Sequence, residues 1–405
     1  MLNIRQFFAR PTLWGALVLF SLALAACGPA PLGTSWPAIS LLNSVCGDKT
    51  TESILVTYND RIVQVNPADG TPIVLKNADC EPRPPDSEGK LRVWDFRASG
   101  KQFYSTPLPL DDQHMLAIAY DQHMFKIDTT QAQASDAAGQ PIDGESGHAV
   151  ADLVASDKYI YVGLNAKDLV ALDRTTLDVK WTAQTQHGVW GKPLLVEGTL
   201  YFSSLDHNLY AIDADTGKQK WVLDLGGAAI GSPLFADNKL YVGSFARQIF
   251  EISTEGQILN KQPTDDWVWG TPTIDNAILY VADLAGNVYG FDTTKNLAPL
   301  WKQKVAVGAI RATPVVSGDV ILVAGHDQKL YWLNRKNGTP LQGADGTPLV
   351  RTLDAPVLSD ILLVQPGNGV DITEPYIVVS TTSTNQILVA YTLETGLFKW
   401  AYKFQ

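Results

Sequence analysis

The sequence is dominated by a unit of about forty residues that recurs along most of the chain. In its best-formed copy, at residues 190–221, short runs of strand-forming residues alternate with polar turns. The turn at 214–217 contains Asp215 and Gly217, residue types that favour a tight reversal of the backbone. Four strands fit within this unit, at 193–196, 200–202, 209–212 and 218–223. Four strands at this period are the pattern of one blade of a β-propeller.

The turn recurs together with a tryptophan that follows it. The pattern Ala-x-Asp-x-x-Thr-Gly-x-x-x-Trp is complete at 211–221, and at 390–400 it departs only by Thr392. Because a single blade cannot bury both faces of its sheet, such units pack against one another. The spacing predicts eight blades between residues 36 and 405, or seven if two weak repeats do not form separate blades. The tryptophans at the repeated position are Trp181, Trp221, Trp301 and Trp400.

This repeat resembles the tryptophan-docking motif of the PQQ-like, or quinoprotein-type, propeller family. The resemblance covers nearly all of the chain after residue 35, with the Thr-Gly pair intact in two copies. It implies an all-β fold, an eight-bladed β-propeller of four-stranded antiparallel blades. It also implies a structural role for the repeated tryptophans, each packed between two blades against the turn of a neighbour.

The first 26 residues have the features of a lipoprotein signal peptide. Arg5 and Arg10 give a basic start, and 13–24 is an apolar segment that is too short for a comfortable membrane span. The sequence Leu-Ala-Ala-Cys at 24–27 resembles the lipobox of bacterial lipoproteins, which implies cleavage before Cys27 and lipidation of its sulfur. The alternative is an ordinary signal peptide with an incidental cysteine. We expect a lipidated Cys27 and tether at 27–35, followed by one propeller domain at 36–405.

These features predict an exported protein that contacts the lipid bilayer through Cys27. Gly28 rather than Asp follows the cysteine. In a diderm host this resembles lipoproteins of the outer membrane that face the periplasm, whereas in a monoderm host the anchor would stay on the outer face of the plasma membrane. The net charge is −11, or −13 without the two leader arginines, which argues against nucleic acid as a partner. We expect a monomeric propeller.

Two further cysteines, Cys46 and Cys80, lie within the first repeat. In an exported protein an even pair of cysteines is a candidate disulfide. On the loop-entropy model such a bond would stabilise the fold by about 3 kcal/mol. The alternative is two free, buried thiols.

The chain lacks the sequence motifs of the enzymes in the family that it resembles. Quinoprotein dehydrogenases bind pyrroloquinoline quinone and calcium and carry a vicinal Cys-Cys pair, which is absent here. The six histidines form no HxH, HExxH or His/Cys cluster. Neither GxSxG nor a phosphate-binding loop occurs. We therefore expect no enzymatic activity, no catalytic residue, no metal site and no cofactor.

Several repeats carry a small residue followed by x-Pro at the start of their first strand, as at Pro193, Pro233, Pro272 and Pro314. The residues around this position are expected to ring one mouth of the central funnel and to bind a partner: Tyr104, Val189, Trp190, Ile230, Trp267, Trp269 and Arg311. Trp, Tyr and Arg are the residue types enriched in binding hot spots. The alternative is that these side chains plug the funnel and pack on one another.

A lipobox, a tether and a propeller without quinone motifs resemble the PQQ-like propeller lipoproteins that serve outer-membrane β-barrel assembly. This resemblance implies a non-enzymatic, membrane-anchored scaffold that binds membrane or envelope proteins through its funnel-side loops. The long inserts at 77–92 and 129–146 depart from that pattern. The alternative function is binding of PQQ or another small ligand at the same mouth, in a sensor or redox protein.

Overall fold

The computed structural model describes residues 36–404 apart from 47–48, 78–79, 137–138, 143–146, 167 and 367–371. Contacts divide the chain into Met1–Ser35 and Trp36–Gln405, and the second unit is the one described below. The predicted signal peptide, the lipidated Cys27 and the tether lie outside the described residues. No helix among the described residues is long and apolar enough to cross a membrane.

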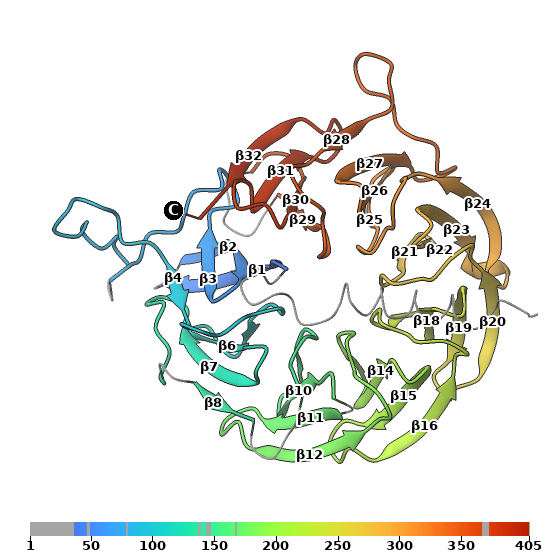
Figure 1. Cartoon of the computed structure of the whole chain (residues 1–405), viewed down its shortest axis with the longest axis horizontal. Helices are drawn as coiled ribbons and strands as arrows, with labels where there is room; N and C mark the ends of the chain where they lie inside the picture. Colours follow the sequence, from blue (N-terminus) through green and yellow to red (C-terminus); the bar gives the residue numbers. More distant parts are fainter. Residues whose placement is uncertain are drawn as a thin grey trace, which may run out of the picture. The chain divides into compact units, whose positions relative to one another are not determined.

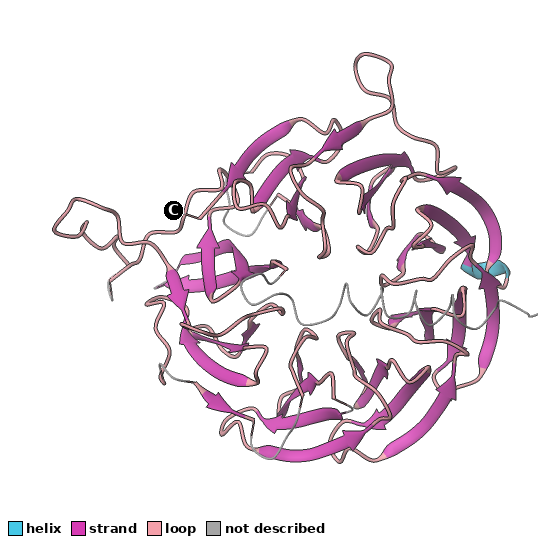
Figure 2. Ribbon diagram, viewed as in Figure 1, coloured by secondary structure: helices cyan, strands magenta, loops and turns pink. Residues whose placement is uncertain are grey.

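Within the second unit, eight antiparallel sheets of four strands are arranged radially about a common axis (Figure 1). Each sheet is built from four strands that are consecutive in the sequence, with the first strand nearest the axis and the fourth at the rim. Figure 2 shows strands and loops almost throughout, with one described 3-10 turn, η1 (Thr293–Lys295). The predicted all-β, eight-bladed propeller is confirmed, and the alternative of seven blades is wrong.

The first four blades follow the chain in order. Their strands are β1 (Ala38–Cys46), β2 (Lys49–Tyr58), β3 (Arg61–Val65) and β4 (Asp95–Arg97); β5 (Leu108–Pro109), β6 (His114–Ile118), β7 (His123–Asp128) and β8 (Gln140–Pro141); β9 (Val154–Ala155), β10 (Tyr159–Gly163), β11 (Asp168–Asp173) and β12 (Val179–Gln184); β13 (Leu194–Val196), β14 (Thr199–Ser203), β15 (Asn208–Asp213) and β16 (Gln219–Asp224).

Blades five to eight complete the ring. Their strands are β17 (Leu234–Ala236), β18 (Lys239–Ser244), β19 (Gln248–Ser253) and β20 (Ile258–Pro263); β21 (Thr273–Asp275), β22 (Ile278–Ala282), β23 (Asn287–Asp292) and β24 (Ala298–Lys304); β25 (Val315–Ser317), β26 (Val320–Gly325), β27 (Lys329–Asn334) and β28 (Val350–Thr352); β29 (Leu362–Val364), β30 (Tyr376–Ser380), β31 (Leu388–Thr392) and β32 (Phe398–Tyr402).

Strand direction gives this unit two different faces. In an antiparallel blade, the connection between the second and third strands and the connection to the next blade lie at one end of the sheet, here called the mouth face. The other connections lie at the opposite end, here called the turn face, which carries the turn at 213–217 and its equivalents. The insert at 77–92 and most of that at 129–146 fall between the third and fourth strands. They therefore interrupt blades one and two on the turn face rather than follow those blades.

Five interfaces between described blades pair a tryptophan ring with a glycine in the turn of the next blade. The ring of Trp221 lies against Gly256, where an added Cβ would stand 2.7 Å from it. The indole N–H of Trp221 donates to the carbonyl of Thr254 in the same turn, at 2.8 Å. Gly256 has a φ of +84°, which only glycine adopts freely. The five pairs are Trp181 with Gly217, Trp221 with Gly256, Trp301 with Gly338, Trp332 with Gly396, and Trp400 with Gly70.

The other three turns carry a residue other than glycine at this left-handed position, namely Ala132, Leu177 and Asn296, with φ values of 54°, 63° and 55°. The preceding blades differ in a matching way on their third strands. Where Ala211 lies opposite Trp221 in blade four, the equivalent residues of blades one, two and five are long and polar. These are Gln64, Lys126 and Glu251. The third-strand residue and the turn residue of the next blade therefore vary together.

The register of the first blade places Trp94, not Val74, at the tryptophan position. Val63 pairs with Asp95 there as Tyr210 pairs with Val222 in blade four, so the next pair along is Gln64 with Trp94. The backbone N–H of Gln64 donates to the carbonyl of Trp94 at 3.5 Å. The spacing of the other repeats, counted from the turn at 66–70, predicts Val74 at this position. That prediction is wrong because the insert separates the turn from β4.

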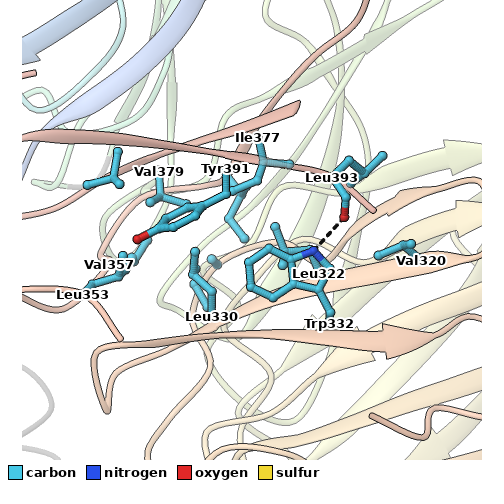
Figure 3. Close-up of a cluster of buried hydrophobic side chains, with 14 of the residues drawn as sticks. Val320, Leu322, Leu330, Trp332, Leu353, Val357, Ile377, Val379, Tyr391 and Leu393 are labelled. Carbon is cyan, nitrogen blue, oxygen red and sulfur yellow. Dashed lines mark hydrogen bonds between the residues drawn. The ribbon is translucent and has the colours of Figure 1, made fainter. Parts of the chain in front are cut away.

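In blade seven the docking ring comes from the third strand instead of the fourth. Trp332 of β27 is fully buried among Leu322, Leu330 and other apolar side chains of blades seven and eight (Figure 3). Its indole N–H donates to the carbonyl of Leu393 in the next turn, at 2.6 Å. The large ring thus keeps its place between two blades although its position in the sequence has shifted.

Blade eight closes the ring against blade one by side-chain packing, without exchange of a strand. The indole N–H of Trp400 donates to the carbonyl of Pro67 at 3.0 Å. The hydroxyl of Ser380 donates to the carbonyl of Pro37 at 3.2 Å. One apolar cluster joins both blades, with Val56 on one side and Val378 on the other. The closing interface is thus built like the other tryptophan-docked interfaces.

Candidate functional site

The predicted mouth residues fall into two groups. Three are buried in the wall, with exposed fractions of 8% or less: Tyr104, Val189 and Ile230. Four are half-buried and keep side-chain surface: Trp190, Trp267, Trp269 and Arg311. Val189 packs in the core between blades three and four, so the first group supports the mouth and the second group presents it.

A row of aromatic rings and one guanidinium crosses the mouth face over three connections. Phe245, between β18 and β19, stacks on Trp267 with centroids 4.5 Å apart and an interplanar angle of 11°. It also contacts Trp269 at 5.7 Å. The guanidinium of Arg311 lies 4.6 Å from the ring centre of Trp269. We call these four residues the mouth array.

Phe245 is the member of the mouth array that sequence reasoning missed. The x-Pro pattern marks only the connections between blades, whereas Phe245 lies in the turn between the second and third strands of blade five. In an antiparallel blade this turn lies at the same end as the connection to the next blade. An aromatic residue at that turn was the signal that could have identified it.

Arg311 is the charged end of the array. It forms no hydrogen bond or ion pair with any residue that the structure describes, and its Nε is buried. A cation over an aromatic face is held by the ring quadrupole, which does not neutralise its charge. Burial lowers the pKa of nearby His326, and the Arg311 charge lowers it further. The guanidinium is therefore available to an anionic group from outside.

A second aromatic group lies on the mouth face over blades one to three. Trp36 meets Tyr104 edge-on at 4.5 Å, and Tyr104 contacts Tyr120 at 5.1 Å. Tyr120 stacks on His148 at 4.0 Å. Burial, with a smaller contribution from Tyr120, raises the pKa of Tyr104 to about 12. Tyr104 is therefore uncharged at neutral pH, and the rings of this group pack against one another.

Carboxylates hold the mouth connections in place. Asp206 accepts hydrogen bonds from the Tyr210 hydroxyl at 2.7 Å and from the backbone N–H of Gln186, in the preceding connection, at 2.8 Å. Asp283 in blade six likewise accepts from the Tyr289 hydroxyl, at 2.7 Å. Burial raises the pKa of Asp206, but these hydrogen bonds more than offset it, and the net pKa is lowered. These internal hydrogen bonds hold the mouth loops in place.

The described residues offer no cluster of three or more His, Cys, Asp or Glu that could hold a metal ion. Two carboxylates link neighbouring connections: Asp152 accepts from the N–H of Thr106 at 2.8 Å, and Asp360 accepts from the N–H of Thr313 at 2.7 Å. The surrounding protein raises the pKa of Asp360 by desolvation, and the Asp152 charge adds to this effect. Both carboxylates accept backbone hydrogen bonds between neighbouring blades.

The remaining predicted site concerns the cysteines. Cys46 ends β1, but its side chain lies outside the described residues, so the disulfide with Cys80 stays a prediction. Lipidation of Cys27 also stays a prediction.

The fold and its repeats define an eight-bladed propeller of the PQQ-like class. The family model described as "Outer membrane protein assembly factor BamB" matches residues 135–232 and 224–345. These matches span more than half of the chain, and the chain belongs to that family.

Individual relatives are distant. The outer membrane protein assembly factor BamB of Xanthomonas campestris pv. campestris is 30% identical over 104 residues, which are 26% of this chain and 25% of that protein. The crystal structure of BamB from Moraxella catarrhalis superposes with a TM-score of 0.61 at 15% identity, covering 89% of this chain and 97% of that one. The computationally designed Ika8 protein gives a TM-score of 0.58 at 12% identity, covering 76% and 92%. At these identities the two structures show the fold alone.

Proposed function

We propose that this protein is a non-enzymatic scaffold, lipid-anchored in the cell envelope, that binds other envelope proteins through its mouth face. The observation that carries the proposal is the mouth array, in which Phe245, Trp267, Trp269 and Arg311 form one continuous row. Trp, Tyr and Arg are enriched in protein-binding hot spots. Aromatic side chains supply a large contact area with few rotatable bonds, and the arginine guanidinium supplies planar paired donors.

The array also indicates the chemistry of the partner. Its aromatic part favours an apolar side chain, and Arg311 favours a carboxylate because no described residue neutralises it. Val307, on the same connection as Arg311, is 87% exposed and extends the apolar surface. A segment with an apolar residue next to Asp or Glu would satisfy both parts.

Family membership and the leader sequence support the location. The family is described as an outer membrane protein assembly factor. The lipobox at 24–27 predicts an anchor on Cys27. A role in assembly of envelope or outer-membrane proteins fits both, with the propeller holding its partner at the membrane surface.

Photo-crosslinking in the native host tests the proposal. A photoreactive phenylalanine replaces Val307 on the mouth face or, as the control, exposed Lys336 on the turn face. We expect a membrane-protein adduct from position 307 and none from 336. Equal adducts from both positions, or none from 307, contradict a mouth-face partner. Cys27→Ser in the same strain should move the protein out of the membrane fraction if the anchor is correct.

A further inference from the structure

The described chain begins on the mouth face of the propeller unit. Trp36 meets the ring of Tyr104 edge-on at 4.5 Å, and Tyr104 lies on the connection from blade one to blade two. Pro37 is buried, and its carbonyl accepts a hydrogen bond from a hydroxyl of blade eight, at 3.2 Å. Ala38 then pairs with Thr57 at the mouth end of β1 and β2. The chain is therefore held on the mouth face from residue 36 onward.

The proposed lipid anchor is close to this point in the sequence. Cys27 and Trp36 are nine residues apart, and a fully extended chain of nine residues spans at most about 32 Å. A random coil of that length spans about 15–18 Å on average. Whatever path the tether takes, a lipid on Cys27 must therefore enter the bilayer within about 32 Å of Trp36.

The height of blade one decides which face can meet the membrane. β1 has nine residues and pairs with β2 along its whole length, so the two strands end on the turn face about 27 Å from the mouth end. The second strands of the other blades have five or six residues, which makes blade one the tallest. A membrane facing the turn face would have to clear this end of blade one, and even a fully extended tether would then have only about 5 Å to spare. From the mouth face the same tether reaches the membrane directly.

We infer that the anchor holds the mouth face toward the membrane and the turn face away from it. This inference rests on the proposed anchor at Cys27, and it deepens the proposed function by specifying the partner. The partner must present its binding segment in the space between the propeller and the lipid surface. A membrane-proximal domain or loop of an integral membrane protein meets this requirement, whereas a soluble protein arriving from the far side would meet the turn face.

Energy transfer to the lipid surface tests this orientation. The full-length lipidated protein is placed, without a partner, in phosphatidylcholine vesicles whose headgroups carry an acceptor dye. A donor dye is attached through an azide-bearing side chain that replaces Val307 or Lys336, both of which are exposed. Val307 lies on the mouth face between blades six and seven and Lys336 on the turn face of blade seven, so a tilt of the ring moves both alike. We expect at least about twofold stronger transfer from position 307, because the two faces are about one strand length, or 17–20 Å, apart.

Two controls separate this inference from the proposed anchor. Cys27→Ser should abolish transfer from both positions, and if that variant stays on the vesicles, the anchor itself is wrong and the inference falls with it. Insertion of about forty Gly and Ser residues after Ser35 should keep the transfer but remove the difference between 307 and 336, because the longer tether no longer limits which face meets the lipid. Equal transfer from both positions with the native tether, or stronger transfer from 336, overturns the inference while the anchor stands. A difference that survives the insertion also overturns it, since the surface of the propeller rather than the tether would then set the orientation.

Discussion

Gly217 lies against the indole ring of Trp181 in the preceding blade, so close that a Cβ at position 217 would stand 2.7 Å from the ring. The backbone at Gly217 also has a φ of +69°, which L side chains rarely adopt. Ala132 occupies the equivalent turn position in blade two, at a φ of 54°. What differs is the facing blade, where Gln64 replaces the small residue that lies opposite a docking tryptophan. Contact with the ring, as well as backbone conformation, therefore accounts for the glycine.

This relationship predicts that Gly217→Ala destabilises the protein far more than a change at the equivalent position of blade two. The new Cβ must displace the ring of Trp181, and the backbone must hold alanine in a left-handed conformation. Together these effects should cost roughly 2–4 kcal/mol. Ala132→Gly is the matched control, and its effect should stay within about 1 kcal/mol. Thermal or urea unfolding measures the stability of both variants, and equal losses would contradict a role for the contact with Trp181.

Three substitutions at the interface between blades five and six should recreate a docked tryptophan there. Glu251 is fully buried there, opposite Asn260 and bonded to Lys239 at 2.6 Å, where Ala211 lies opposite Trp221 in blade four. Asn260→Trp alone should destabilise by about 1–3 kcal/mol, because Glu251 occupies the space that the ring needs.

Adding Glu251→Ala and Asn296→Gly to Asn260→Trp should recover most of that loss, since the three changes recreate the docked arrangement. Urea unfolding of the single and triple variants measures the recovery. A triple variant that is no more stable than Asn260→Trp would show that the three positions do not act as a unit.

Much of this architecture could be predicted from the sequence because it rests on local, repeated signals. The turn at 213–217 and the tryptophan that follows it lie at a fixed spacing within one hairpin, so the sequence alone is enough to identify them. Trp94 and Trp332 escaped that reasoning for a physical reason. The packing requires a large ring between two blades. The fourth strand can supply it after an insert, as with Trp94, and the third strand can supply it instead, as with Trp332.

The candidate site was harder to predict because it depends on contacts between blades. The x-Pro pattern identified Trp267, Trp269 and Arg311, which lie on connections of one type. Burial separated Val189 and Ile230 from them, and burial is decided by neighbouring blades rather than by the local sequence. Phe245 was missed because it reaches the same surface from a turn within a blade.

The lowered pKa of Asp206 predicts acid sensitivity of the mouth loops. Since the folded-state pKa lies below the usual value of about 4, the ionised carboxylate contributes stability above that pH. This contribution is lost as the pH falls through the lowered pKa. Asp206→Asn should therefore lower the melting temperature at pH 7 and have a much smaller effect near pH 2.

Asp215→Asn is the control, because Asp215 forms an exposed ion pair with Lys158 at 2.7 Å. Such pairs contribute little, so its melting temperature should match that of the wild type at both values of pH. A loss of stability in Asp206→Asn that is the same at pH 7 and pH 2 would show that its carboxylate charge is not what braces the loop.

The mouth array gives the prediction that separates a binding surface from a plug. Trp269 and Arg311 are half-buried, and Arg311 bonds to no described residue. Trp269→Ala and Arg311→Ala should each change stability by no more than about 0.5 kcal/mol, yet weaken partner binding by more than about 1 kcal/mol. Arg311→Lys keeps the charge but loses the planar stack and the paired donors, so its binding should be intermediate. Melting temperature and co-purification from solubilised membranes measure the two effects, with Lys336→Ala on the turn face as control. If both alanine variants unfold early, these side chains hold the funnel together and the partner surface lies elsewhere.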